Sequence, residues 1–463
     1  MDRLAQLEAR TTQLSAAVQN LAGHGRNLDS SRGPGCAMLD PETCKELDKA
    51  KSSILASLAD IKRLVAGPAD FLQHLASQVQ VLACLQWLAD FQILACIPLD
   101  ASVPVRDLVD LAGVPEGQLA RVIRLTAAVG FLKEPAPHVV AHTSLSAQFV
   151  ADESLADAAM FLAQVVAPSA LQMPLATQQF GAIPGPGDSA FSLLNTTPGS
   201  GSFEEALDRN HKLGRQWRAY LQHSAGLNLD DEIVDVISQL NWSGLNHACI
   251  VENHGLIGDL LLGAGSSSPS PVAAASAAGG AGSSSTGSSG SGSGSGSTST
   301  STSNTNSPRI TVVHRDTNLP QPVTDADVYV LHLREALSSP RPASSSSSSS
   351  SAPLGLGEPK TVQIRSQLHE YLAILRDSGR IALILTSHLL PEPNTLANPE
   401  VEAVARARDL TLLHLANESD MEMTDLQSAV DGVSDRAGRL VIASWLRSHN
   451  GLVLALAVKY QAH

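Results

Sequence analysis

Residues 249–262, CIVENHGLIGDLLL, constrain the fold of this chain more than any other stretch. A short apolar run ending at Val251 leads into a turn with Gly255 and Gly258, and an apolar segment follows. This order of strand, turn and helix is typical of the first unit of a nucleotide-binding α/β domain, where glycines let the backbone approach the ligand. The sequence therefore predicts an α/β domain with a largely parallel sheet.

The C-terminal half continues that pattern. Apolar segments at 309–316, 325–337 and 380–389 are expected strands, and residues 362–378 predict an amphipathic helix closed by Gly379. Residues 439–460 predict an antiparallel hairpin around Asn450 and Gly451. Strands that alternate with helices and end in a hairpin favour a class I methyltransferase-like α/β domain.

Charge and length limit the possible classes of protein. The 463 residues suffice for two domains with linkers, and 43% of them are hydrophobic. The net charge of −14 predicts a surface that repels nucleic acid. Residues 1–20 carry no apolar block of a signal peptide, and no apolar run is expected to be long enough to span a membrane. We expect a soluble intracellular protein.

Cysteines and histidines do not predict a metal site. Cys36 and Cys44 have no histidine beside them, and the odd number of five cysteines favours a reducing compartment. The other cysteines lie in apolar runs and are expected to be reduced core residues; they are Cys84, Cys96 and Cys249. Four histidines have spacings that fit no ligand set and are expected on the surface: His211, His223, His247 and His254.

The N-terminal segment predicts a helix with heptad-like spacing. Its apolar positions are Leu4, Leu7, Leu14, Val18 and Leu21, and Thr11 interrupts them. Two interpretations are equally open: a helix for dimerisation or partner docking, and a helix folded back on its own domain. Residues 24–36 are expected to be a linker, and a second helix is expected over 41–65.

Residues 68–170 predict one coherent domain. A long apolar helix is expected to run to Pro98, followed by helices over 105–111 and 116–129 and a wing-like hairpin through residue 150. Helix, turn, helix and wing are the elements of a winged helix. The second helix offers only Arg121 and Arg124 as basic residues, which favours dimerisation over DNA reading.

Low-complexity tracts divide the rest of the chain. Residues 180–202 predict a loop and 203–237 predict helix, whereas residues 263–307 and 340–353 contain little besides small and polar residues and are expected to be disordered and dispensable. The resulting domain prediction is a coiled-coil-like helix, a helix with linker, a winged-helix-like dimerisation domain and an α/β domain, with the ranges 1–25, 41–67, 68–170 and 203–463.

The order of these parts resembles SAM-dependent O-methyltransferases of plant and fungal type, in which a winged-helix dimerisation domain precedes the catalytic α/β domain. Three segments more narrowly resemble the fungal aflatoxin-cluster transcriptional coactivator family. These segments are LACLQWLADFQILACIPLDASVP (82–104), AGVPEGQL (112–119) and VGFLKEPAPHVVAHTSLSAQFV (129–150). The family resemblance implies a methyltransferase outline that serves beside a Zn2Cys6 activator of a polyketide gene cluster.

Three features of a working methyltransferase are expected to be missing. The resembled loop reads roughly V-D-x-G-G-G-x-G; Val251 and Glu252 match it, but His254 and Leu256 stand where glycines belong. The second strand, with the acid that holds the ribose, should fall within 263–307, and none is visible there. The base of the family is a histidine, and its place holds Ala336, Leu337 and Ser338, while His332 lies earlier, inside the expected strand.

The sequence thus predicts a pathway-specific transcriptional coactivator in the nucleus. It would act through a Zn2Cys6 activator, as a homodimer through residues 68–150, without direct DNA binding or membrane contact. No catalytic, cofactor-binding or metal-binding residue is predicted, and no cofactor. The alternatives are an O-methyltransferase acting on an aromatic polyketide, and a pseudoenzyme that regulates such an enzyme.

Overall fold

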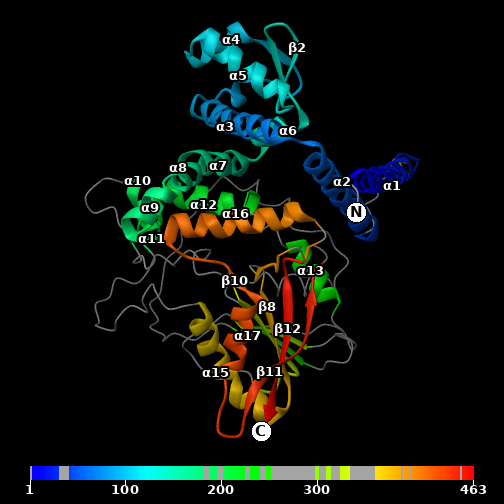
Figure 1. Ribbon diagram of the computed structural model, residues 1–463, viewed down its shortest axis with the longest axis vertical. Coiled ribbons are helices and arrows are strands. Elements are labelled where there is room, and N and C mark those ends of the chain that lie inside the picture. The colour runs from blue at the N-terminus through cyan, green and yellow to red at the C-terminus, as the bar shows by residue number, and fades with distance from the viewer. Residues whose placement is uncertain are drawn as a thin grey trace, which may run out of the picture. The chain divides into compact units, whose positions relative to one another are not determined.

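A computed structural model describes residues 3–30, 41–181, 187–194, 202–224, 230–239, 247–251, 298–301, 309–313, 324–333, 360–386, 389–393, 395–396, 398–448 and 451–463. The chain forms two compact units. Unit 1 combines Met1–Asn228 with Pro391–Asp420, and unit 2 combines Leu229–Leu390 with Met421–His463. Figure 1 shows their helices and strands.

Unit 1 begins with a helical hairpin of α1 (Arg3–Ser30) and α2 (Pro41–Val65). Arg10 of α1 pairs with Asp60 of α2 at 3.1 Å, and the side chain of Arg3 donates to the carbonyl of Leu64. Ala17 is buried, and Leu4 and Val18 are exposed, so only part of the heptad pattern faces α2. The structure thus favours the folded-back interpretation. The predicted linker over 24–36 was wrong for its first residues, because α1 continues to Ser30.

The next helix, α3 (Pro68–Asp90), is shorter than predicted. The sequence prediction ran it to Pro98, but Gln92 has a φ of 53°, which a continuing α-helix does not allow. A short 3₁₀ turn, η1 (Leu94–Cys96), follows. Ile93 and Leu94 turn into a core cluster shared with the following helices. Apolar composition alone could not locate this helix end.

Helix, turn and helix come next, as predicted. α4 (Val105–Ala112) ends at Gly113, whose φ of 65° is the left-handed conformation that glycine adopts readily, and α5 (Glu116–Ala128) begins after Pro115. A three-stranded antiparallel sheet of order β1-β3-β2 accompanies them, made of β1 (Ser102–Pro104), β2 (Leu132–Ala136) and β3 (Val139–His142). Residues after His142, predicted as part of the hairpin, instead form α6 (Ser144–Ala151), because Thr143 caps that helix by accepting from the Ser146 amide.

A helical assembly completes unit 1. Its helices are α7 (Glu153–Phe161), the π-helical turn η2 (Leu162–Val166), α8 (Ala167–Leu171), α9 (Met173–Phe180), α10 (Ala190–Leu194), α11 (Phe203–Arg209), α12 (His211–His223) and α16 (Pro399–Ala416). α10 lies within the predicted loop 180–202, which was wrong there. The helix predicted over 203–237 is interrupted where the Asn210 side chain accepts from the amides of Lys212 and Leu213.

One helical run in unit 1 has the length and hydropathy of a membrane span. It covers Glu153–Leu171, so the prediction that no run was long enough was wrong. The run is continuous because the π turn η2 joins α7 to α8. Ala158, Ala159, Met160 and Phe161 are buried, and α7 packs against α12, while only 33% of the run is buried inside the structure.

Unit 2 is built on a seven-stranded sheet of order β11-β12-β8-β7-β4-β6-β5 among the described residues. β4 pairs in parallel with β6 and with β7, and β7 pairs in parallel with β8. β12 is antiparallel to both β8 and β11, and β5 is antiparallel to β6. The strands are β4 (His247–Val251), β5 (Thr298–Ser301), β6 (Arg309–Val313), β7 (Val328–Leu333), β8 (Ile381–Thr386), β11 (Gly438–Arg447) and β12 (Leu454–Ala462).

Helices α15 (Lys360–Ser378) and α17 (Met423–Asp431) share one apolar core with this sheet, and α13 (Asp230–Ser238) also belongs to unit 2. Leu368, Tyr371 and Leu375 recur at helical spacing along α15 and are buried in that core. The Tyr371 ring meets the ring of Tyr329 from β7 with centroids 5.6 Å apart. Gly379 ends α15 with a φ of 65°, as predicted, and the terminal hairpin forms as predicted around residues 450–451.

The chain leaves unit 2 once before its last strands. It departs after β9 (Leu389–Leu390) and returns at β10 (Met421–Glu422), and these two short strands pair in parallel as a separate two-stranded sheet. The segment between them carries α16, which contacts α8, α10 and α11 of unit 1. The predicted domain ranges remain a prediction, and the compact units group residues 203–224 and 391–420 with the N-terminal part.

Candidate functional site

The topology of unit 2 locates where a cofactor would bind in a parallel sheet. β4 has its later neighbours β6 and β7 on opposite sides, so the strand order reverses at the carboxyl end of β4, where ligands of such sheets bind. Residues 252–297 follow that end and lie outside the described residues. The predictions on Glu252, His254 and Leu256, and those on 336–338, therefore stay predictions.

The second strand of the sheet is present. It was expected within 263–307 and judged missing, but β6 (Arg309–Val313) pairs in parallel with β4, with His247 opposite Arg309 and Val251 opposite Val313. The prediction that this strand is missing was therefore wrong, and a missing strand no longer supports the loss of the ribose-holding acid. Asp316 follows β6 in the sequence and lies outside the described residues. The expected disorder of 263–307 also fails at Thr298–Ser301, which forms the edge strand β5.

His332 lies inside β7, as the sequence predicted. β7 is a central strand between β4 and β8, and His332 is opposite Leu385 in the register with β8. In this strand Tyr329 and Leu331 alternate with His332 and belong to the core shared with α15. The backbone position is that of a central-strand residue, and the prediction that His332 is not a displaced base stays a prediction.

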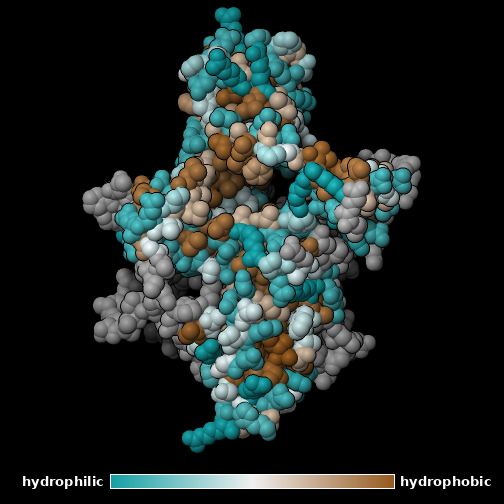
Figure 2. Space-filling view, viewed as in Figure 1, coloured by the Kyte–Doolittle hydropathy of each residue, from teal (hydrophilic) through white to brown (hydrophobic). Residues whose placement is uncertain are grey.

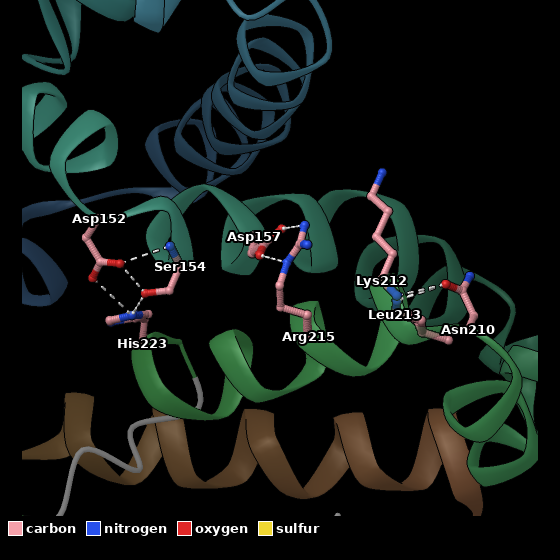
Figure 3. A network of polar contacts seen from close by, with 8 residues as sticks. All are labelled: Asp152, Ser154, Asp157, Asn210, Lys212, Leu213, Arg215 and His223. Carbon is pink, nitrogen blue, oxygen red and sulfur yellow. Dashed lines mark hydrogen bonds and ion pairs between the residues drawn. The ribbon is translucent and has the colours of Figure 1, made fainter. Parts of the chain in front are cut away.

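A network of polar contacts joins α7 to α12 in unit 1 (Figure 3). Arg215 binds both carboxylate oxygens of Asp157, with its Nη2 3.1 Å from Oδ1. At the start of α7, the Ser154 hydroxyl and amide both donate to Asp152, and these hydrogen bonds lower the pKa of Asp152. His223, at the end of α12, places Nε2 2.6 Å from Ser154 Oγ.

Aspartate, serine and histidine in contact suggest a catalytic triad, but the geometry excludes one. A carboxylate only accepts hydrogen bonds, so the Ser154 proton points to Asp152 and His223 Nε2 must donate to Ser154 Oγ. Asp152 also faces Nε2, at 3.7 Å, whereas the aspartate of a triad orients the other ring nitrogen. The three residues therefore cap α7 and fasten it to α12. His223 was expected on the surface, and the structure half-buries it.

Five aromatic side chains form the interior of the helical assembly. Phe161, Phe191, Phe203, Trp217 and Tyr220 come from four different helices and are all buried. The centroids of Phe161 and Tyr220 are 5.2 Å apart, and those of Phe203 and Trp217 are 5.3 Å apart in edge-to-face geometry. The whole chain has only sixteen aromatic residues, so this cluster concentrates almost a third of them.

A buried ion pair lies beside that cluster. Arg408 Nε donates to Asp420 Oδ2 at 2.7 Å, and the side chains are 2% and 0% exposed. Both Nη atoms of Arg408 are buried without an acceptor among the described residues. Burial raises the pKa of Tyr220, while its hydrogen bond with Thr411 and the charge of Arg408 oppose that shift. On α16, the helix that carries Arg408, burial lowers the pKa of His414.

Sequence reasoning missed this ion pair, although one signal was available. Arg408 lies on the face that also carries Ala405, Leu412 and Leu415, so a charged residue interrupts the apolar stripe of an amphipathic helix. Such a residue needs a partner in the interior.

No metal cluster is visible in the part of the chain that the structure describes. No group of three or more His, Cys, Asp and Glu side chains gathers there. Cys84 and Cys249 are buried, as predicted, and burial raises the pKa of the Cys84 thiol. Cys96 is half-buried.

Solved structures share this arrangement, and one of them is named as a methyltransferase. OxaC matches with a TM-score of 0.52 at 14% identity, covering 99% of this chain and all of the other. LepI in complex with SAM matches with a TM-score of 0.53 at 12% identity, covering 97% of this chain and all of the other. Mitomycin 7-O-methyltransferase MmcR gives 0.51 at 14% identity, covering 85% and 98%. The protein therefore has a helical N-terminal part followed by a methyltransferase-like α/β fold.

Sequence relatives identify the family within that fold. The model of the "Trypacidin cluster transcriptional coactivator tpcD N-terminal domain" matches residues 4–66, the span of the α1–α2 hairpin. The notoamide biosynthesis cluster transcriptional coactivator notR of Aspergillus sp. (strain MF297-2) is 42% identical over all of this chain and 99% of its own. The monodictyphenone cluster transcriptional coactivator mdpA of Emericella nidulans is 37% identical, with the same coverage. The chain belongs to this family of cluster transcriptional coactivators.

Proposed function

We propose that this protein is a pathway-specific transcriptional coactivator of a fungal aromatic polyketide gene cluster. It acts in the nucleus through a Zn2Cys6 activator and does not transfer a methyl group. One observation carries the proposal: relatives named as cluster coactivators align over the whole chain, across both units, at identities such as 42% and 37%. The match therefore includes the methyltransferase-like sheet as well as the N-terminal hairpin.

The surface of α5 supports action through a partner. Leu119, Val122 and Ile123 are buried, so the exposed face of this helix offers Arg121 and Arg124 with Glu116 at its start. Two arginines give too few phosphate contacts for a DNA reader that neutralises many phosphates. The net charge of −14 also disfavours binding to DNA. Sequence-specific binding is thus assigned to the activator.

Two alternatives are kept for the α/β unit. It is an O-methyltransferase acting on an aromatic polyketide, or a pseudoenzyme that regulates one. The fold of OxaC and MmcR favours the first. The second differs from the coactivator only in its partner, and a pull-down followed by mass spectrometry separates those two.

Deletion of the gene is expected to silence transcription of the cluster, measured as transcript levels of its biosynthetic genes. Isothermal calorimetry of the purified protein with SAM is expected to give no binding heat. Unchanged transcripts together with an accumulating unmethylated metabolite would contradict the coactivator function. Micromolar SAM binding would reinstate the methyltransferase.

The coactivator is proposed to act as a homodimer through residues 68–150. Residues 79–97 are rich in apolar side chains, which suggested from the sequence that they need a partner surface. In the structure, however, Leu88, Ile93 and Leu94 are buried in the core of their own domain. The uncovered residues lie earlier, where almost every residue of 68–80 is exposed, including Phe71, Leu72, Leu75 and Val79. Figure 2 shows hydrophobic side chains gathered over α3 and α7. A projecting helix with four large apolar side chains gains stability from a second copy.

Replacing Leu72 and Leu75 together by Asp is expected to give a folded monomer, because the charges face the proposed interface and no core side chain is removed. Sedimentation velocity measures the mass of the full-length protein. Leu111→Asp on α4 is the matched control, since Leu111 is equally exposed, and it should leave the dimer intact. A wild-type protein that sediments as a monomer contradicts the homodimer.

A further inference from the structure

The outer face of α2 carries exposed apolar side chains together with lysines. Lys51, Leu55, Leu58, Lys62 and Val65 recur at spacings of four, three, four and three residues, which puts them within roughly 80° of arc at 3.6 residues per turn. Leu55, Leu58 and Val65 are 57%, 48% and 64% exposed. We call these five residues the α2 stripe; Figure 2 shows hydrophobic and hydrophilic side chains side by side on the surface of this hairpin.

The hairpin does not need the α2 stripe in order to fold. α1 packs on other positions of α2, where Ala50, Ser57 and Ala59 are buried. The ion pair between Arg10 and Asp60 and the hydrogen bond from Arg3 to the Leu64 carbonyl fasten the two helices. Asp60, on the side of α2 that faces α1, also binds Arg63. Large apolar side chains that the fold leaves outside mark an interaction surface.

Charge separates the hairpin from the rest of the chain. Residues 1–66 contain nine basic and eight acidic side chains, whereas the remaining residues contain 22 basic and 37 acidic ones. The two charged residues of the α2 stripe are both lysines. An acidic partner segment is thus attracted to this face and repelled by the remainder of the protein, which sets where it docks.

We infer that the α2 stripe is the docking surface for an acidic amphipathic helix of the activator. The inference rests on the proposed coactivator function and adds the surface and the chemistry of the partner. A helix with apolar side chains at i, i+3 and i+7 can place them against Leu55, Leu58 and Val65, and its flanking carboxylates then reach Lys51 and Lys62. A second copy of the stripe fits less well, because it brings side chains of like charge together.

The coactivator family is also defined on this part of the chain. The matching family model spans residues 4–66, which is the α1–α2 hairpin from its first turn to its last. The hairpin therefore resembles the N-terminal domain of a cluster transcriptional coactivator, and the α2 stripe lies within that domain.

The binding experiment uses the full-length protein and a fluorescein-labelled synthetic peptide. The peptide is an amphipathic helix with leucine and phenylalanine on one face and glutamate on the other, and anisotropy measures its affinity. Leu55→Ser with Leu58→Ser is expected to weaken binding by about tenfold or more, the loss of two central apolar contacts. Lys62→Glu is expected to weaken it and to reduce its dependence on salt. Leu111→Ser, on another exposed leucine of unit 1, is expected to bind as the wild type does.

Three results would overturn the inference. They are unchanged affinity of the double serine variant, equal binding of a peptide with lysine in place of glutamate, and a reduced sedimentation mass of the double variant, which would make the stripe a contact between copies. Circular dichroism is expected to show unchanged helix content, since no buried residue is altered.

A fungal strain separates this inference from the function on which it rests. If deletion silences the cluster and the double serine variant silences it too, both stand. If deletion silences the cluster and the variant restores full transcription, the function stands and the docking surface is wrong. If deletion leaves transcription unchanged, the proposed function fails.

Discussion

Replacement of Asp420 by alanine is expected to destabilise unit 1 by about 3–5 kcal/mol, because it leaves the Arg408 charge buried without its partner. The two side chains are 2% and 0% exposed, so water cannot take the place of the carboxylate. Both Nη atoms of Arg408 already lack an acceptor within the described residues, which leaves the carboxylate as the main compensation for the charge. A domain has only about 5–15 kcal/mol of stability, so the loss is a large fraction of it.

Hydrogen exchange followed by mass spectrometry measures this loss locally. Peptides from α12 and α16 are expected to exchange faster in the variant, while peptides from β7 and β8 keep their protection, since they belong to unit 2. The matched control is Glu205→Ala, which removes the exposed pair with Arg209 and should cost about 1 kcal/mol or less. Arg408→Met with Asp420→Leu should recover most of the loss, because apolar replacement removes both charges.

Equal exchange rates in Asp420→Ala and Glu205→Ala would contradict this account. The site matters because Asp420 is the last residue of unit 1 before the chain enters unit 2 again at Met421. Its backbone amide also donates to the carboxylate of Asp409 at 2.8 Å. Arg408 and Asp409, adjacent residues of α16, therefore both bind Asp420 at the point where the chain passes from one unit to the other.

Local sequence signals predicted the helix–turn–helix well. Gly113 and Pro115 mark the end of one helix and the start of the next, and the structure follows both within one residue of the expected bounds. Gly379 also ends its helix as predicted, and the last two strands pair as the predicted antiparallel hairpin. In these places a single residue determines the backbone conformation, so no distant contact is needed to predict it.

Features that depend on distant contacts were not predictable in this way. β5 and β6 pair side by side, but composition made the tract before β6 look structureless, so the second strand was judged missing. The end of α3 at Asp90 depends on Ile93 and Leu94 turning into the core formed with α4 and α5. Chain order placed α16 in the α/β domain, whereas its buried face packs on helices of unit 1.

The candidate site shows the same division. The sequence located His332 inside its strand correctly, because a run of apolar residues at 328–333 suffices for that. It did not pair Arg408 with Asp420, nor join Ser154 to His223, 69 residues away, since no local pattern records such contacts. The predicted loss of methyl transfer was based on residues 252–262 and 336–338, which lie outside the described residues. Calorimetry with SAM is therefore the test of that prediction.

Replacement of Trp217 by alanine is expected to destabilise unit 1 by about 3–5 kcal/mol, the usual loss for a large aromatic residue in a core. Trp217 is 3% exposed and contacts the rings of Phe161, Phe203 and Tyr220. Alanine leaves a cavity among rings that come from four helices. Closing it requires α7 and α12 to shift relative to each other, and the ion pair between Asp157 and Arg215 opposes that shift.

Urea denaturation followed by far-ultraviolet circular dichroism measures the loss, because that signal does not depend on the tryptophan removed. The matched control is Trp445→Ala, since Trp445 on β11 is 54% exposed and its loss should change stability by only about 0.5 kcal/mol. Trp217→Phe should fall between them, because a smaller ring keeps part of the edge-to-face contact with Phe203. If Trp217→Ala and Trp445→Ala shift the midpoint equally, the five rings do not form the core of unit 1, and the polar contacts of α7 with α12 and of Arg408 with Asp420 hold it together instead.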